Sequence, residues 1–307
     1  MEDKFKDFEI IQKIQEDENE KEFRYLNIGE FLGENIDAIY TESKNFNARR
    51  IVENEIRNDS MRLVMDELNQ KTIYLPNTVH NNKVINLDKY LENGDLLFRD
   101  ISGDVTKVKD ENENINNEKY IIEVIDEEAD AVIGKNINYP ISMQVADCVA
   151  IYIYDPITKA FGLVHSGWRG TVNLIIVNTI EKLKKDFNVD PKDLKIILSP
   201  AISKDMYPAI KSKYTLFEEM LKNENMNETK YILNTDEKDI KKIDLKGIIK
   251  DILKEKYKIK EENILDINED TLTSKNELGE FKYHSHIRGK DNAGRNMAVI
   301  FKNENKK

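Results

Sequence analysis

The sequence predicts one α/β (α+β) domain in which mixed β-sheets are flanked by helices. Short runs of β-branched and aromatic residues alternate irregularly with runs of helical periodicity, a pattern typical of mixed sheets rather than of a doubly wound parallel sheet. No linker rich in Pro, Gly or Ser and no internal repeat divides the 307 residues. A chain of this length is long enough to bury a substantial core.

The first half of the chain is predicted to combine two helical segments with short strands. Residues 1–24 are dense in charge but carry apolar residues near helical spacing, which favours a short peripheral helix. Residues 47–68 have the i, i+3, i+4, i+7 stripe of a buried helix face. The polar stretch 107–119 has too few apolar side chains to order itself, so a surface loop is expected. Strands are predicted at 72–75, 83–87, 120–125, 131–133 and 141–145.

The most regular segment of the second half is a predicted β-hairpin. The apolar runs VAIYIY at 149–154 and AFGLVH at 160–165 are joined by DPITK, with Pro156 at a turn position. Because both faces of these runs are apolar, the hairpin is expected at the buried centre of a sheet. A helix is predicted over 171–187. Further elements are predicted after it: strands at 194–198, 264–267 and 297–301, and helices at 216–221 and 244–257.

Composition and charge exclude several classes of function. The chain has 47 Lys and Arg residues against 58 Asp and Glu, a net charge of −11. It therefore lacks the excess of basic residues that is typical of a nucleic-acid-binding protein. No apolar run approaches the roughly 18 residues of a membrane span, and the N-terminus lacks the apolar core of a signal peptide. A single cysteine excludes an internal disulfide framework and suits a reducing compartment. We therefore expect a cytoplasmic protein without a nucleic-acid or membrane partner.

The hairpin brings the only cysteine close to a histidine. If the turn is centred between Pro156 and Ile157, Cys148 lies opposite His165, and paired residues point to the same face. Such an imidazole either lowers the pKa of a nucleophilic thiol or joins the thiolate as a metal ligand. A third ligand would complete a zinc site with an open position. The remaining histidines are His80, at a predicted strand end, and His284 and His286, spaced i, i+2 near the final loop; taken alone, each is more typical of a surface or packing residue. A buried structural cysteine beside a core histidine is the alternative without chemistry.

Two longer motifs resemble the YfiH family, whose members are often described as laccase-domain or polyphenol oxidase proteins and are understood as purine nucleoside phosphorylases. QVADC at 144–148, followed by GLVHSGWRG at 162–170, resembles the TADC and VHAGWRG signature of that family in residues and in spacing. Further similarity lies at 78–80, 128–134, 199–207 and 285–298. The resemblance implies a YfiH-like single domain over residues 36–303, preceded by a charged N-terminal extension over residues 1–35.

The resemblance also implies a cofactor and a reaction. It implies a zinc ion held by His80, Cys148 and His165. The family activity is phosphorolysis of adenosine, inosine or methylthioadenosine to the free base and a pentose 1-phosphate, with adenosine deamination at the same zinc site. The implied partners are therefore two small molecules, a purine nucleoside and phosphate.

Four further residues are candidates for catalytic roles. Phosphorolysis needs cationic groups that hold phosphate against the anomeric carbon. Arg169, Arg288 and Arg295 are the candidates for this role. Asp130 is expected to orient a zinc ligand or to accept a proton. An ordinary salt bridge is the alternative for each of the four.

Other classes of function remain beside the zinc phosphorylase. A metal-free Cys–His hydrolase would use Cys148 as its nucleophile and would tolerate the loss of His80. A member that binds a ligand without turnover is suggested by residues that depart from the family pattern: Thr78, Asn81, Asp205, Met206, His286 and Ile287. A copper oxidase is rejected, because His284 and His286 alone would remain for the oxygen-reducing cluster, which is rich in imidazoles.

Overall fold

The fold is described from a computed structural model of the chain. It describes residues 15–16, 22–49, 54–93, 97–100, 105–107, 120–123 and 128–303. Almost all of the predicted polar loop at 107–119, and most of the N-terminal segment 1–24, lie outside the described residues. In the described parts, no helix is both long enough and apolar enough to cross a membrane.

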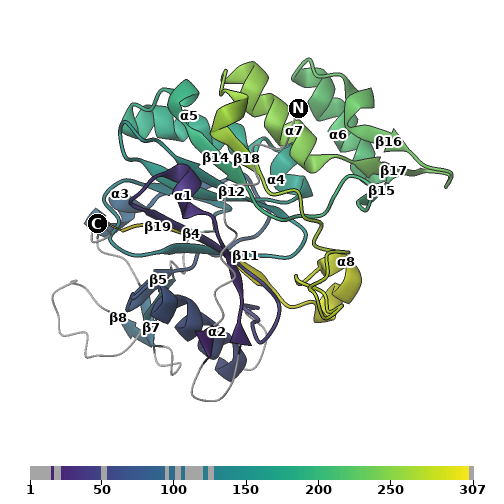
Figure 1. The fold of residues 1–307 in the computed structure, drawn as a ribbon. Coiled ribbons are helices and arrows are strands. Elements are labelled where there is room, and N and C mark those ends of the chain that lie inside the picture. Colours follow the sequence, from purple (N-terminus) through teal and green to yellow (C-terminus); the bar gives the residue numbers. More distant parts are fainter. Residues whose placement is uncertain are drawn as a thin grey trace.

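Two large mixed sheets form the centre of the molecule (Figure 1). The six-stranded sheet has, in order, β18 (Ile264–Asp266), β14 (Lys195–Leu198), β12 (Val149–Tyr154), β13 (Phe161–Ser166), β10 (Ala131–Gly134) and β6 (Val84–Asn86). The eight-stranded sheet has, in order, β3 (Tyr25–Asn27), β4 (Ile36–Thr41), β19 (Asn296–Lys302), β11 (Ile141–Val145), β5 (Thr72–Tyr74), β9 (Tyr120–Glu123), β7 (Leu97–Asp100) and β8 (Val105–Lys107). Each contains parallel and antiparallel pairs, so the predicted mixed-sheet α/β class is confirmed.

The two sheets pack against each other through one apolar core, and helices cover their outer faces. Along β12, Ala150 and Tyr152 face the core between the sheets, whereas Ile151 and Ile153 face the helices, as the two-residue period of a strand requires. The Tyr152 hydroxyl donates to the Ile39 carbonyl of the other sheet at 2.7 Å. The six-stranded sheet is covered by α5 (Ile175–Phe187) and α7 (Leu245–Asp251), with α6 (Lys211–Asn223) beside them in the same apolar cluster, and the eight-stranded sheet is covered by α2 (Asn54–Glu67) (Figure 1).

The predicted hairpin is confirmed at the centre of the six-stranded sheet, but its register differs from the prediction. Ala150, not Cys148, pairs with His165, because the connecting loop extends to the Asp155–Ala160 hydrogen bond. Continuing this register places Cys148 opposite Gly167. The difference is two residues along the strand, and an even shift leaves the two side chains on the same face.

The predicted helices differ from the observed ones in their bounds; α6, for example, extends beyond the predicted 216–221 at both ends. The helix expected over 171–187 is interrupted at Leu174, whose φ of 56° is left-handed, so that α4 (Trp168–Val172) ends before α5 begins. The helix expected from residue 47 begins at Asn54. Asn47 is not helical, because its side chain accepts the backbone N–H groups of Arg49 and Arg295.

Several elements were not predicted from the sequence. The largest is a three-stranded antiparallel sheet of β15 (Pro208–Ile210), β17 (Ile240–Ile243) and β16 (Ile232–Asn234). At 15–16 and 22–23, where a helix was expected, the described residues form the short strands β1 (Gln15–Glu16) and β2 (Glu22–Phe23). The segment expected as one helix over 244–257 is α7 followed by a π-helical turn over Ile252–Lys256. Small elements complete the fold: α1 (Gly29–Leu32), α3 (Leu87–Asn93), α8 (His286–Gly289), and 3-10 turns at Pro191–Asp193, Glu228–Lys230, Glu261–Asn263 and Lys290–Asn292.

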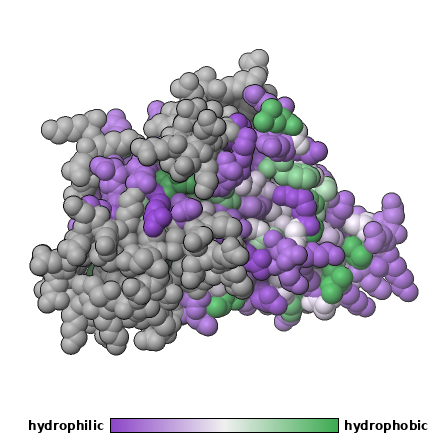
Figure 2. All heavy atoms as spheres, turned by 90° about the horizontal axis from the view of Figure 1, so that it is seen from below, coloured by the Kyte–Doolittle hydropathy of each residue, from purple (hydrophilic) through white to green (hydrophobic). Residues whose placement is uncertain are grey.

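The surface agrees with the charged composition. On the face in Figure 2, the described residues are mostly hydrophilic, with hydrophobic residues scattered among them. The chain as a whole is 34% charged residues. Among the described residues in this view, no broad apolar face is visible.

Candidate metal centre

Three predicted ligands, His80, Cys148 and His165, converge where the chain crosses from one sheet to the other. Their ligand atoms all lie within 4.8 Å of one another, and this is the one such group of three found among the described residues. The rings of His80 and His165 are 4.8 Å apart between centroids, with an interplanar angle of 71°. The structure therefore brings together side chains from the loop before β6, the turn before β12 and the strand β13.

Asp130 positions both histidines of this group. It is fully buried, and the backbone N–H groups of Val79, His80 and Asn81 donate to its carboxylate at 3.1, 3.0 and 2.8 Å. Its Oδ1 lies 2.7 Å from Nδ1 of His165. Burial alone would raise the pKa of the Asp130 carboxyl, but its hydrogen bond to His165 brings that pKa below the ordinary value. The carboxylate thus fixes the loop of one histidine and leaves Nε2 of the other free for the site.

The turn that carries Cys148 is held by its neighbour Asp147. Asp147 has a left-handed φ of 78°, at the point where the chain leaves β11 for β12. Its buried carboxylate accepts hydrogen bonds from the Thr271 hydroxyl at 2.7 Å, the Ser285 hydroxyl at 3.0 Å and the Ile287 backbone at 2.8 Å. Sequence reasoning assigned Asp147 no role, although its place in VADC beside the cysteine was a signal.

The thiol and imidazole favour their charged forms together. Burial would raise the pKa of the Cys148 thiol, but His165 and His80 beside it lower it to about 6. Burial would lower the pKa of His165, but Cys148 and Asp130 raise it to about 10. A thiolate is the form that either a metal or a nucleophilic mechanism requires.

Gly167, in the turn between β13 and α4, leaves room for the side chains of Cys148 and His80 to lie close to the backbone of this turn. A Cβ atom at this position would lie 2.8 Å from Sγ of Cys148 and 3.1 Å from Cδ2 of His80. Both distances are shorter than normal carbon contacts, so any larger residue would displace the two side chains.

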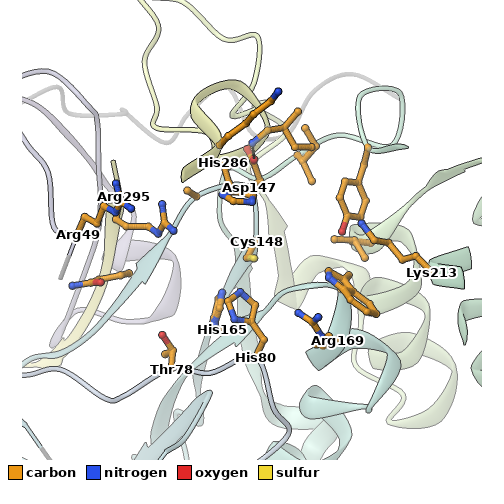
Figure 3. Close-up of a pocket in the computed structure, with 18 of the residues that line it drawn as sticks. Arg49, Thr78, His80, Asp147, Cys148, His165, Arg169, Lys213, His286 and Arg295 are labelled. Atoms are coloured by element: carbon orange, nitrogen blue, oxygen red, sulfur yellow. Dashed lines mark hydrogen bonds between the residues drawn. The ribbon is translucent and has the colours of Figure 1, made fainter. Parts of the chain in front are cut away.

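The three side chains open into a cavity of about 680 Å³ (Figure 3). The described residues that line it include one carboxylate, that of Asp147. The lining also includes five cationic side chains, those of Arg49, Arg169, Lys213, Lys290 and Arg295. In a chain of net charge −11, this cavity is therefore a local concentration of positive charge.

The three predicted arginines do not all reach the cavity. Arg169 and Arg295 line it. Arg288 does not: its guanidinium donates to the backbone carbonyls of Thr271 and Leu272 at 3.2 and 2.8 Å, and also to that of Tyr283. Three cations that sequence reasoning missed also line the cavity: Arg49, Lys213 and Lys290. Lys290 lies in the similar segment 285–298, whereas Arg49 and Lys213 belong to no motif that marked them. Of the residues that depart from the family pattern, three line it: Thr78, His286 and Ile287.

The chain matches a protein family described as "Multi-copper polyphenol oxidoreductase laccase" over residues 42–303. It is similar to a purine nucleoside phosphorylase from Bacteroides thetaiotaomicron, with 32% identity over 29% of this chain and 33% of that protein. It is also similar to one from Borreliella burgdorferi, with 38% identity over 24% of this chain and 32% of that protein. A third, from Rickettsia prowazekii, is 25% identical over 62% of this chain and 75% of that protein. The chain thus spans about a third of the length of the first two relatives.

Solved structures share the fold. The YfiH protein of Bacillus licheniformis superposes with a TM-score of 0.67 at 19% identity, covering 91% of this chain and 98% of that one. YlmD from Geobacillus stearothermophilus superposes with a TM-score of 0.68 at 19% identity, covering 95% and 99%.

Proposed function

This chain belongs to the laccase-domain, or YfiH, family, and on that premise we propose that it is a zinc-dependent purine nucleoside phosphorylase acting in the cytoplasm. Its substrates would be phosphate and adenosine, inosine or methylthioadenosine. The observation that carries the proposal is the convergence of His80, Cys148 and His165 at a cavity lined by cations. The names of the curated relatives support the reaction class.

The donor set suits zinc. One thiolate and two imidazoles are ligands that zinc accepts, and three protein ligands leave a fourth position open. Bound there, zinc would supply Lewis-acid chemistry to the substrate. Asp130 would keep the proton of His165 on Nδ1, so that Nε2 remains available as a ligand. The same carboxylate would hold the backbone of His80 in place.

The cations would bind the anionic co-substrate. In phosphorolysis the bond from the anomeric carbon to the purine breaks while an oxygen of phosphate bonds to that carbon, and fixed positive charge stabilises this exchange. Arg169 and Arg295 are placed for this role, because both line the cavity. We assign Arg288 to positioning, since its guanidinium holds the backbone that leads into α8.

Adenosine deamination is a second activity that we propose for the same centre. Water would replace phosphate as the nucleophile and would attack the carbon that carries the amino group. The bond from that carbon to the amino nitrogen would break, releasing ammonia and giving inosine. Asp130 would act in this reaction through its contact with His165, whereas Asp147 is the carboxylate that lines the cavity. Phosphate would have no part in this reaction.

We do not propose copper oxidation, although the family description names it. The whole chain contains four histidines, and two of them belong to the candidate centre. His284 donates through Nε2 to the Phe46 carbonyl at 2.7 Å. A multi-copper centre needs more imidazoles than this chain has.

A metal-free thiol hydrolase is the second candidate, and one observation favours it. Asp130, His165 and Cys148 form a chain of carboxylate, imidazole and thiol, which is the arrangement of a Cys–His–acid nucleophile. The two candidate functions differ in whether they require His80. A metal centre needs it as a ligand, whereas the thiol dyad does not.

The test is an assay of adenosine cleavage with and without phosphate, on wild type, His80→Ala and Cys148→Ala. Phosphate-dependent release of adenine and ribose 1-phosphate by wild type, lost in both variants, is the expected result. An activity that survives in His80→Ala but not in Cys148→Ala would contradict the phosphorylase and favour the hydrolase. A protein that binds zinc but cleaves no nucleoside would instead be a ligand-binding member of the family.

A further inference from the structure

Four of the five cations that line the cavity form two separate pairs, and the fifth is Lys290. In Figure 3, Arg49 and Arg295 lie on one side of Cys148, and Arg169 and Lys213 lie on the other. Within each pair the charges influence each other. The pKa of Arg295 is lowered by burial and by the charge of Arg49, and the pKa of Lys213 is lowered by burial and by the charge of Arg169. The metal centre therefore lies between two positive groups.

Neither pair is neutralised by a carboxylate among the residues that the structure describes. Salt bridges are found elsewhere in this part of the chain, but none involves these four side chains. The one carboxylate of the lining, Asp147, accepts three hydrogen bonds from Thr271, Ser285 and Ile287. Arg49, Lys213 and Arg295 are half-buried and Arg169 is exposed. Like charges at such sites repel each other, and a bound anion would relieve that repulsion at each pair.

Aromatic rings hold the second pair in place. The Arg169 guanidinium carbon lies 4.4 Å from the ring centroid of Trp168, and Nζ of Lys213 lies 5.4 Å from the same centroid. Nζ of Lys213 is also 5.0 Å from the ring centroid of Tyr207. These are cation–π distances, so the only tryptophan of the chain positions two cations at once. A wall that is both aromatic and cationic suits an organic phosphate better than a free, hydrated one.

We propose that the cavity binds two anions together, inorganic phosphate at Arg49 and Arg295, and a phosphate group carried by the nucleoside at Arg169 and Lys213. The preferred substrate is then a purine nucleoside 5′-phosphate. This inference rests on the proposed phosphorolysis, but it changes the preferred substrate from the free nucleoside to the nucleoside 5′-phosphate. It also reassigns Arg169 from inorganic phosphate to that 5′-phosphate. A single phosphate bound at one pair would leave the other pair, across Cys148, uncompensated.

The reaction balances without a further reactant. The bond between the anomeric carbon and the purine nitrogen breaks, and the purine leaves with the bonding electrons. An oxygen of hydrogen phosphate bonds to the anomeric carbon, and the proton of the hydrogen phosphate passes to the purine. Adenosine 5′-phosphate therefore gives adenine and ribose 1,5-bisphosphate.

The experiment compares adenosine with adenosine 5′-phosphate as substrates of the zinc-loaded protein at saturating phosphate. Wild type is expected to prefer the nucleotide by about tenfold or more in kcat/KM, the effect of one charge-assisted contact. Lys213→Gln is expected to remove most of this preference, and Lys213→Arg to keep it. Lys211→Gln is the matched control, because Lys211 lies exposed on the same helix, α6, and does not line the cavity.

The assignment of the two pairs is tested in the same assays. Arg295→Gln is expected to raise the KM for phosphate with either substrate, without changing the ratio between substrates. Cleavage of adenosine with no preference for the nucleotide would overturn this inference and leave the phosphorylase intact. A Lys213→Gln variant that raises the KM for phosphate instead of changing the ratio would also overturn it. Failure of the zinc-loaded protein to cleave either substrate would overturn the phosphorylase itself, and this inference with it.

Discussion

Asp130 is the residue on which the geometry of the candidate metal centre depends most. One buried carboxylate accepts three consecutive backbone N–H groups around His80 and also contacts Nδ1 of His165. Two of the three candidate ligands are therefore positioned by a residue that is not itself one of the three. The sequence suggested Asp130 as an orienting residue by family resemblance, but the three backbone contacts depend on a loop that no local pattern specifies.

Replacing Asp130 with Asn is expected to weaken zinc binding about 10-fold to 100-fold, because an amide does not fix the tautomer of His165 as a carboxylate does. Competition with a chromophoric chelator measures this affinity. Asp88→Asn is the control, since Asp88 also accepts backbone N–H groups, from Lys135 and Asn136, but does not line the cavity. Zinc affinity equal to wild type in Asp130→Asn would show that the carboxylate does not orient a ligand.

At the scale of elements, the turn from β13 into α4 sets how closely the ligands approach. Gly167→Ala would place a Cβ atom 2.8 Å from Sγ of Cys148, so we expect loss of zinc binding. Gly279→Ala is a useful comparison, because Gly279 has open space around it but a φ of 80°. It is expected to lower stability by about 1 kcal/mol and to leave zinc binding unchanged. Zinc content and thermal unfolding of both variants test this, and normal zinc in Gly167→Ala would contradict it.

The hairpin shows what local patterns predict well and where they fail. Its strands and its buried central position followed from apolar runs on both faces, and the structure confirms them. The register of the hairpin did not follow from these runs, because the loop from Asp155 to Ala160 is longer than the expected turn. The prediction that Cys148 and His165 share a face survived only because the shift was even.

At the scale of the whole molecule, the strands with strong apolar patterns were predictable, and contacts between distant segments were not. Arg49 and Lys213 belong to no motif, and they reach the cavity only through the packing of loops and of α6. Arg288 looked equivalent to Arg295 in the sequence, but its backbone carbonyl partners hold it away from the cavity. The break at Leu174 was hidden because its neighbours continue an apolar helical stripe.

The zinc content of the purified protein tests the three-ligand centre most directly. Inductively coupled plasma mass spectrometry would be applied to wild type, His80→Gln, Cys148→Ser and His286→Gln. His286→Gln is the control, because His286 lines the cavity but lies outside the ligand group. The account predicts about one zinc per chain in wild type and in His286→Gln, and much less in the two ligand variants. Wild-type protein without zinc, or His80→Gln with the zinc content of wild type, would contradict it.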